Sequence, residues 1–86
     1  MTKKELILDC LIDDDEAKTQ IAEFLKLNNV TYTDSELVSL LDEMIVDGLI
    51  SINYKWKNEN NEYPYSLTKF GREIWNNIIE NNVSIK

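Results

Sequence analysis

TDSELVSLLDEMIVDGLI, residues 33–50, predicts a helix that leads directly into a strand. Thr33 and Glu36 have the spacing of a capping box, in which each side chain accepts a hydrogen bond from the other residue's backbone N–H. Gly48 is expected to end the helix, because glycine readily adopts the left-handed backbone conformation of a helix C-terminus. Apolar residues recur between these two points with the period of an amphipathic helix; they are Leu37, Leu41, Met44 and Ile45.

A first helix is expected well before this stretch, over about residues 3–12. Thr2 and Glu5 form a second capping box at its start. The helix is apolar on most of its sides, so we expect it to occupy the centre of a small domain.

A second helix is expected over about residues 16–27, with one apolar stripe facing the core. Asp14 or Asp15 is predicted to cap it, because a short carboxylate accepts hydrogen bonds from the free N–H groups of a helix start. Asn28–Asn29 is predicted to end it, since asparagine tolerates the left-handed conformation.

The sequence period changes from 3.6 to 2 after Gly48, which indicates a half-buried strand. Residues 58–62, NENNE, provide a turn, and residues 63–67 return antiparallel. Pro64 cannot donate a hydrogen bond, so this second strand either lies at an edge or begins at Tyr65. The first strand is expected to direct four alternate side chains inward: Ile50, Ile52, Tyr54 and Trp56.

A last helix is predicted from Thr68, its cap, to about Glu80, and residues 82–86 are expected to fray. Its inward row is expected to be Phe70, Ile74 and Ile78. Trp75 and Ile79 then lie on another side of the helix. An exposed pair of this kind is a candidate homodimer contact.

The order helix, helix, turn, helix, hairpin, helix resembles that of a winged helix. IAEFLKLNNVTYTDSELVSLLDEMIVDGLI, residues 21–50, is similar to the helix-turn-helix core of that superfamily. YSLTKFG, residues 65–71, resembles the Y-x-L-T-x-x-G signature of regulators of the MarR and PadR type. The resemblance covers about residues 3–80 and implies an α+β winged-helix fold in one domain, residues 1–86.

The resemblance implies one of two functions, since winged helices also serve as protein-interaction modules. A dimeric DNA-binding regulator would place the helix at 33–47 in the major groove. Its DNA contacts would come from two serines of this helix and from cations of the hairpin and last helix: Ser35, Ser39, Lys55, Lys57, Lys69 and Arg72.

Charge favours the protein-interaction module over DNA binding. The chain has a net charge of −7, and no basic residue lies between Lys26 and Lys55. A polyanion is repelled by such a surface, whereas a basic protein is attracted to it. Immunity proteins and antitoxins, which inhibit basic nuclease toxins, are the functional analogy. The predicted acidic face is Asp34, Glu36, Asp42, Glu43 and Asp47.

The residue inventory argues against an enzyme, a metal site or a bound cofactor. The chain has no histidine, one cysteine and two glycines, so it lacks the commonest general base and any glycine-rich phosphate loop. Cys10 stands among apolar residues, which predicts a buried thiol. No signal peptide or membrane-spanning run is apparent, so we expect a cytoplasmic protein with no membrane partner.

Overall fold

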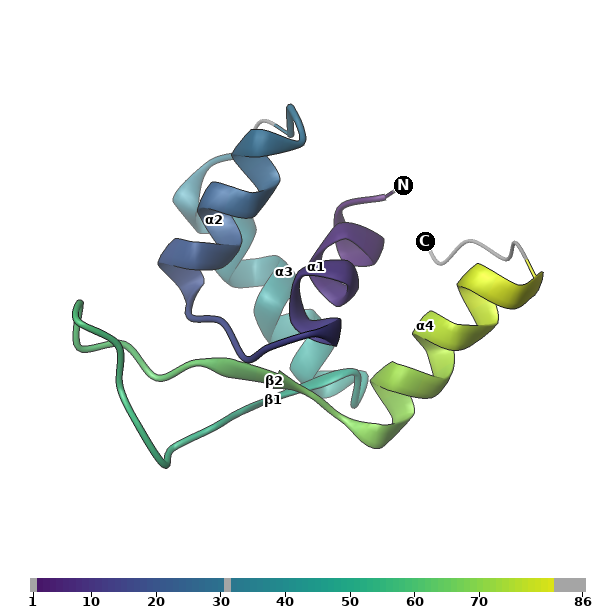
Figure 1. Ribbon diagram of the computed structural model, residues 1–86. Coiled ribbons are helices and arrows are strands. Elements are labelled where there is room, and N and C mark those ends of the chain that lie inside the picture. The colour runs from purple at the N-terminus through teal and green to yellow at the C-terminus, as the bar shows by residue number, and fades with distance from the viewer. Residues whose placement is uncertain (1, 31, 82–86) are drawn as a thin grey trace.

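The computed structural model describes residues 2–30 and 32–81 and has four helices and one antiparallel hairpin (Figure 1). α1 lies between α2 on one side and α4 on the other, with α3 behind it and the hairpin beneath (Figure 1). This is the α+β winged-helix fold that the sequence predicts. The elements are α1 (Lys3–Ile12), α2 (Lys18–Leu27), α3 (Asp34–Val46), β1 (Ile50–Ile52), β2 (Tyr65–Leu67) and α4 (Lys69–Asn81).

The core is built around α1, as its apolar sequence predicts. Every other helix and both strands contribute side chains to the core or pack against it. Full burial of one such aliphatic side chain contributes about 1.5–3 kcal/mol. The buried cluster comprises Leu6, Ile7, Leu8, Leu11, Ile21, Leu25, Leu37, Leu41, Met44, Leu49, Ile50 and Trp75.

Both predicted capping boxes are confirmed. The Glu5 backbone N–H donates to Thr2 Oγ1 at 3.2 Å, and the Thr2 N–H donates to Glu5 Oε1 at 2.7 Å. The equivalent distances for Thr33 and Glu36 are 3.1 and 2.9 Å. Gly48 has a φ of +76° after α3, as the sequence predicts.

The predicted start of the second helix is wrong by two residues. α2 begins at Lys18, and neither Asp14 nor Asp15 caps it. Ala17 is the N-cap residue, and its backbone N–H donates to Gln20 Oε1 at 2.7 Å. A glutamine three residues into the helix therefore satisfies the N–H of the N-cap residue, while Ala17 has no side-chain group that could accept from the first turn as the aspartates were expected to do.

The acidic linker before α2, residues 13–17, forms hydrogen bonds with the hairpin instead. Asp15 Oδ2 accepts hydrogen bonds from Asn53 Nδ2 at 2.9 Å and from Ser66 Oγ at 2.6 Å. Glu16 pairs with Tyr65 through two backbone hydrogen bonds, of 3.2 and 2.8 Å. The linker thereby adds a third, one-residue strand position beside β2.

The hairpin is much shorter than predicted, because its strands hold three residues each. β2 begins at Tyr65, as Pro64 predicted, and the proline carbonyl accepts the Asn53 N–H at 2.8 Å. Pro64 has no N–H to donate to the opposite strand, so the pairing of β1 with β2 ends at Ile52 and Tyr65. The inward positions predicted for Tyr54 and Trp56 are wrong, since these residues are 68% and 44% exposed.

The inward face of α4 also differs from the prediction. A Cβ on Gly71 would lie 2.0 Å from the Leu49 carbonyl oxygen. The face of α4 that carries Gly71 therefore packs directly against the backbone of Leu49. Trp75 follows Gly71 on the same face and is only 6% exposed, whereas Phe70, predicted to point inward, is 50% exposed.

Other predictions for this helix are confirmed. Ile74 and Ile78 pack against the core. Thr68 caps α4, since its Oγ1 accepts the Gly71 N–H at 2.9 Å. The tail expected to fray, residues 82–86, lies outside the described residues.

Candidate functional site

The exposed face of α3 is the first part of the candidate site. Successive residues of a helix are turned by about 100°, so Ser35, Ser39 and Val46 lie opposite the buried stripe. All three are exposed, and Val46 is 84% exposed. The outermost row of α3 is therefore made largely of uncharged side chains.

Three of the five predicted acidic residues are held by lysines from other helices. Glu43 lies 2.6 Å from Lys4 Nζ, and Glu36 lies 3.8 Å from Lys3 Nζ, both at the start of α1. These carboxylates occupy the flank of α3 that faces α1.

The third pair forms at the first turn of α3. Lys18, the first residue of α2, lies 3.0 Å from Asp34 Oδ1. A hydrogen bond with Asp34 raises the pKa of Lys18. The Thr33 backbone and hydroxyl, with help from the charge of Lys3, lower the pKa of Glu36. Lys18 and Glu36 are thus favoured in their charged forms.

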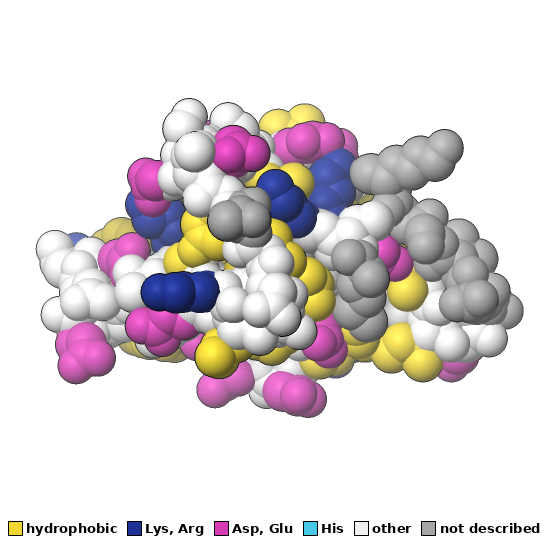
Figure 2. All heavy atoms as spheres, turned by 90° about the horizontal axis from the view of Figure 1, so that it is seen from above, with side chains coloured by type: hydrophobic (Ala, Val, Ile, Leu, Met, Phe, Trp, Pro, Cys, Tyr) yellow, Lys and Arg dark blue, Asp and Glu magenta, His cyan; other side chains and the backbone are white. Residues whose placement is uncertain are grey.

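The acidic face is therefore smaller than the sequence suggests. Asp42 and Asp47 are exposed and form no ion pair with any residue that the structure describes. Residues far apart in the chain supply the neutralising lysines, so no local spacing signals these pairs. Figure 2, seen from above, shows carboxylates around the molecule with lysine or arginine beside several of them.

The wing, residues 53–64, carries the second part of the site. Tyr54, Lys55, Trp56 and Lys57 are all exposed. The rings of Tyr54 and Tyr63 meet edge to face with centroids 4.9 Å apart. Lys57 Nζ lies 4.8 Å from the Tyr63 ring centroid, a cation–π contact. The wing thus presents cations and aromatic rings together.

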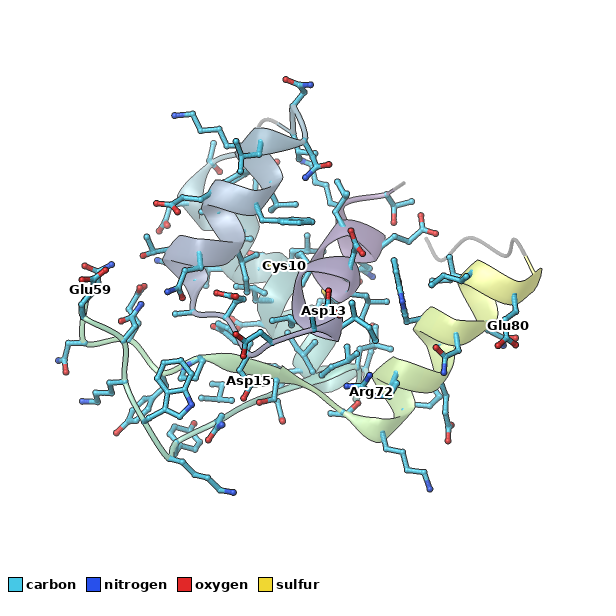
Figure 3. All side chains as sticks on the ribbon, viewed as in Figure 1. Cys10, Asp13, Asp15, Glu59, Arg72 and Glu80 are labelled. Atoms are coloured by element: carbon cyan, nitrogen blue, oxygen red, sulfur yellow. The ribbon has the colours of Figure 1, made fainter. Side chains whose placement is uncertain are left out.

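The four predicted cations fall into two separate pairs. Lys55 and Lys57 belong to the wing, whereas Lys69 and Arg72 are exposed in the first turn of α4. Figure 3 shows Arg72 at the opposite end of the hairpin from Glu59, which marks the far end of the wing. The four cations predicted to contact DNA therefore form a wing pair and an α4 pair.

The two residues of the predicted dimer contact, Trp75 and Ile79, differ in burial. Trp75 packs in the core of its own chain, so it is unavailable as half of an exposed pair. Ile79 is 59% exposed and remains a candidate.

Cys10 is half-buried, and burial, with the charges of Glu16 and Asp9, raises the pKa of its thiol to about 12. A thiol of this kind is a poor nucleophile.

Across residues 2–30 and 32–81, no three cysteine, aspartate or glutamate side chains gather as ligands for a metal ion. None of the helices in this part of the chain has the length and apolar character needed to cross a membrane.

Comparison with known proteins identifies relatives by structure. No family model and no curated protein matches the chain. A PadR family transcription regulator from hypervirulent Clostridium difficile superposes with a TM-score of 0.77 at 20% identity, covering 93% of this chain and 83% of that one. A transcriptional regulator from Clostridium thermocellum gives 0.74 at 20% identity, covering 92% and 78%.

A third solved structure is Bacillus subtilis PadR in complex with operator DNA. It superposes with a TM-score of 0.74 at 20% identity and covers 96% of this chain. This chain spans 49% of that protein's length. These similarities confirm the winged-helix fold.

Proposed function

We propose that this chain is a winged-helix transcription regulator that binds duplex DNA through α3 and the wing. The ion pairs on α3 carry this proposal. With Asp34, Glu36 and Glu43 held by lysines, the electrostatic objection to DNA weakens. The resemblance of the fold to PadR, one structure of which contains operator DNA, supports the same function.

The outer row of α3 suits contacts to base edges. Ser35 and Ser39 would donate hydrogen bonds to base edges or accept hydrogen bonds from them. Lys55 and Lys57 would contact phosphates from the wing, where Trp56 stands between them. Lys69 and Arg72 form a second, separate cationic pair for the backbone.

The net charge of −7 repels DNA everywhere outside these contacts, so the affinity of one copy for DNA should be low. We therefore expect steep salt dependence and a need for two copies, each presenting one wing. Ile79 on α4 is the proposed contact between the copies.

The test is fluorescence anisotropy with labelled duplexes, one from the DNA flanking the gene and one unrelated, between about 50 and 200 mM salt. Lys55→Glu should weaken binding and reduce the slope of log affinity against log salt by about 1. Lys26→Glu is the matched control, since it makes the same charge change at the exposed end of α2. Equal effects of the two variants, or no binding at the lowest salt, would contradict the proposal.

A second candidate is the acidic protein-binding module that the charge pattern favours. Its specific support is that Asp42 and Asp47 stay exposed without an ion pair in the described chain. Charge complementarity would draw a basic protein, such as a nuclease toxin, to this side of α3. Capture of such a protein by the wild-type chain, lost in Asp42→Lys/Asp47→Lys and indifferent to Lys55→Glu, would favour this candidate.

A further inference from the structure

A groove at the base of the wing has a composition that the proposed DNA contacts do not use. It lies between the wing and the start of α2 and has a volume of about 360 Å³, which is within the range of small-molecule sites. Its lining combines three tyrosines with one carboxylate, one lysine and one aliphatic side chain: Tyr54, Tyr63, Tyr65, Glu62, Lys18 and Ile52.

Glu62 is fixed in place by two side chains. Thr19 Oγ1 donates to Glu62 Oε1 at 2.7 Å, and Asn58 Nδ2 donates to the same oxygen at 3.2 Å. The hydrogen bond from Thr19 is the main reason that the pKa of Glu62 is lowered. The carboxylate is therefore ionised and oriented, and the hydrogen bonds from Thr19 and Asn58 both fall on Oε1.

Three tyrosine rings line the same groove as this carboxylate. Tyr54 meets Tyr63 edge to face, with centroids 4.9 Å apart. Tyr65 is half-buried, and burial, followed by the charge of Asp42, raises the pKa of its hydroxyl. Tyr63 already holds the ammonium group of Lys57 against its ring, which shows that a cation is accommodated in this environment.

The local charge is negative despite the lysine in the lining. Lys18 lies 3.0 Å from Asp34, and its charge also acts on Glu62; Lys57 brings a second positive charge, against Tyr63. The carboxylates of Asp34, Glu62 and Asp42, the last of which acts on Tyr65, outnumber these two cations by one. Aromatic faces and carboxylates together attract organic cations, whose charge is spread over a large and weakly hydrated group.

We propose that this groove binds a small organic cation of the alkylammonium class, with the tyrosine rings against its methyl groups and Glu62 opposite its charge. The proposal is independent of DNA binding, because each of its contacts comes from the groove itself. Glu62 is the charge-recognising residue.

The test is a titration of the full chain with choline, followed by NMR of the tyrosine ring resonances. The matched ligand is 3,3-dimethylbutan-1-ol, which has the shape of choline without its charge. We expect saturable shifts with choline and much weaker binding of the alcohol. Equal binding of the two ligands, or no saturable shift with choline, would overturn the proposal.

Variants locate the site. Glu62→Gln removes the charge while its amide oxygen can still accept from Thr19 and Asn58, and it should weaken choline binding by about fivefold or more. Glu59→Gln is the control, because Glu59 lies on the same wing and does not line the groove. Equal effects of the two variants would place the cation elsewhere. Should Glu62→Gln fail to fold, the comparison of choline with its uncharged analogue on the wild-type chain still decides the question.

Discussion

Replacing Gly71 with alanine tests how closely α4 packs against the rest of the fold. The added Cβ would lie 2.0 Å from the Leu49 carbonyl oxygen and 3.0 Å from Leu67 Cδ1. The first obstacle is backbone, which cannot turn aside as a flexible side chain can. Since Cβ atoms essentially never approach another heavy atom within 3.0 Å, α4 has to move outward.

The cost follows from that movement. Overpacking a well-filled core typically costs about 1–3 kcal/mol. Moving α4 would also loosen Trp75 and stretch the 3.1 Å bond from the Thr68 N–H to the Leu49 carbonyl. The higher helix propensity of alanine offsets about 1 kcal/mol of this loss in folding stability. We expect a net loss of about 1–3 kcal/mol, with about 1 kcal/mol of it from the weakened hydrogen bond, out of the roughly 4–13 kcal/mol typical of a domain this size.

Urea unfolding, followed by tryptophan fluorescence and circular dichroism, measures this loss. Gly48→Ala is the comparison, because a Cβ on Gly48 would meet only Phe70 Cδ2, at an ordinary contact distance of 4.0 Å, so its cost comes from the φ of +76°. It should cost about 1–2 kcal/mol. If Gly71→Ala is as stable as the wild type, the close contact between α4 and Leu49 is wrong.

Three further predictions follow from the structure. Trp75→Ala should destabilise the fold by about 3–5 kcal/mol in urea, whereas Ile79→Glu should leave stability nearly unchanged and shift sedimentation toward the monomer; comparable destabilisation would contradict their different burial. Asp42→Asn should tighten duplex binding by about threefold in anisotropy, and Asp13→Asn should do so less. Cys10 should react with iodoacetamide at pH 9 at least about a hundredfold more slowly in the folded chain than in urea. Because the pKa of this thiol rises from 9.0 to about 12 on folding, its contribution to stability is complete below pH 9 and is lost as pH rises toward 12.

Local signals in the sequence predicted the helices well. The capping boxes at Thr2 and Thr33 and the glycine at position 48 fix helix ends through bonds within a few residues, so their chemistry can be read directly from the spacing. Pro64 likewise predicted where β2 begins.

Features that depend on distant contacts were not predictable in this way. Trp56 alternates like a buried strand residue, yet it is exposed because the ladder ends at the proline of the opposite strand. The phase of α4 is set by the approach of Gly71 to Leu49, which the apolar pattern of that helix does not reveal.

The candidate site shows the same division. The carboxylates of α3 were identified from the sequence, but the lysines that neutralise Asp34, Glu36 and Glu43 come from other helices. A charge count along the chain therefore exaggerated the negative surface. The tyrosine groove was missed for a related reason, since it joins the start of α2 to both arms of the wing.

The backbone pairing of Glu16 with Tyr65 has a consequence for behaviour at high concentration. An open strand edge is a template on which other chains add strands and aggregate. β2 is paired with β1 on one side and with Glu16 on the other, and Pro64 stands just before it without an N–H. The remaining edge, along β1, is only three residues long. We therefore expect the hairpin to be a poor template for the addition of strands from other chains.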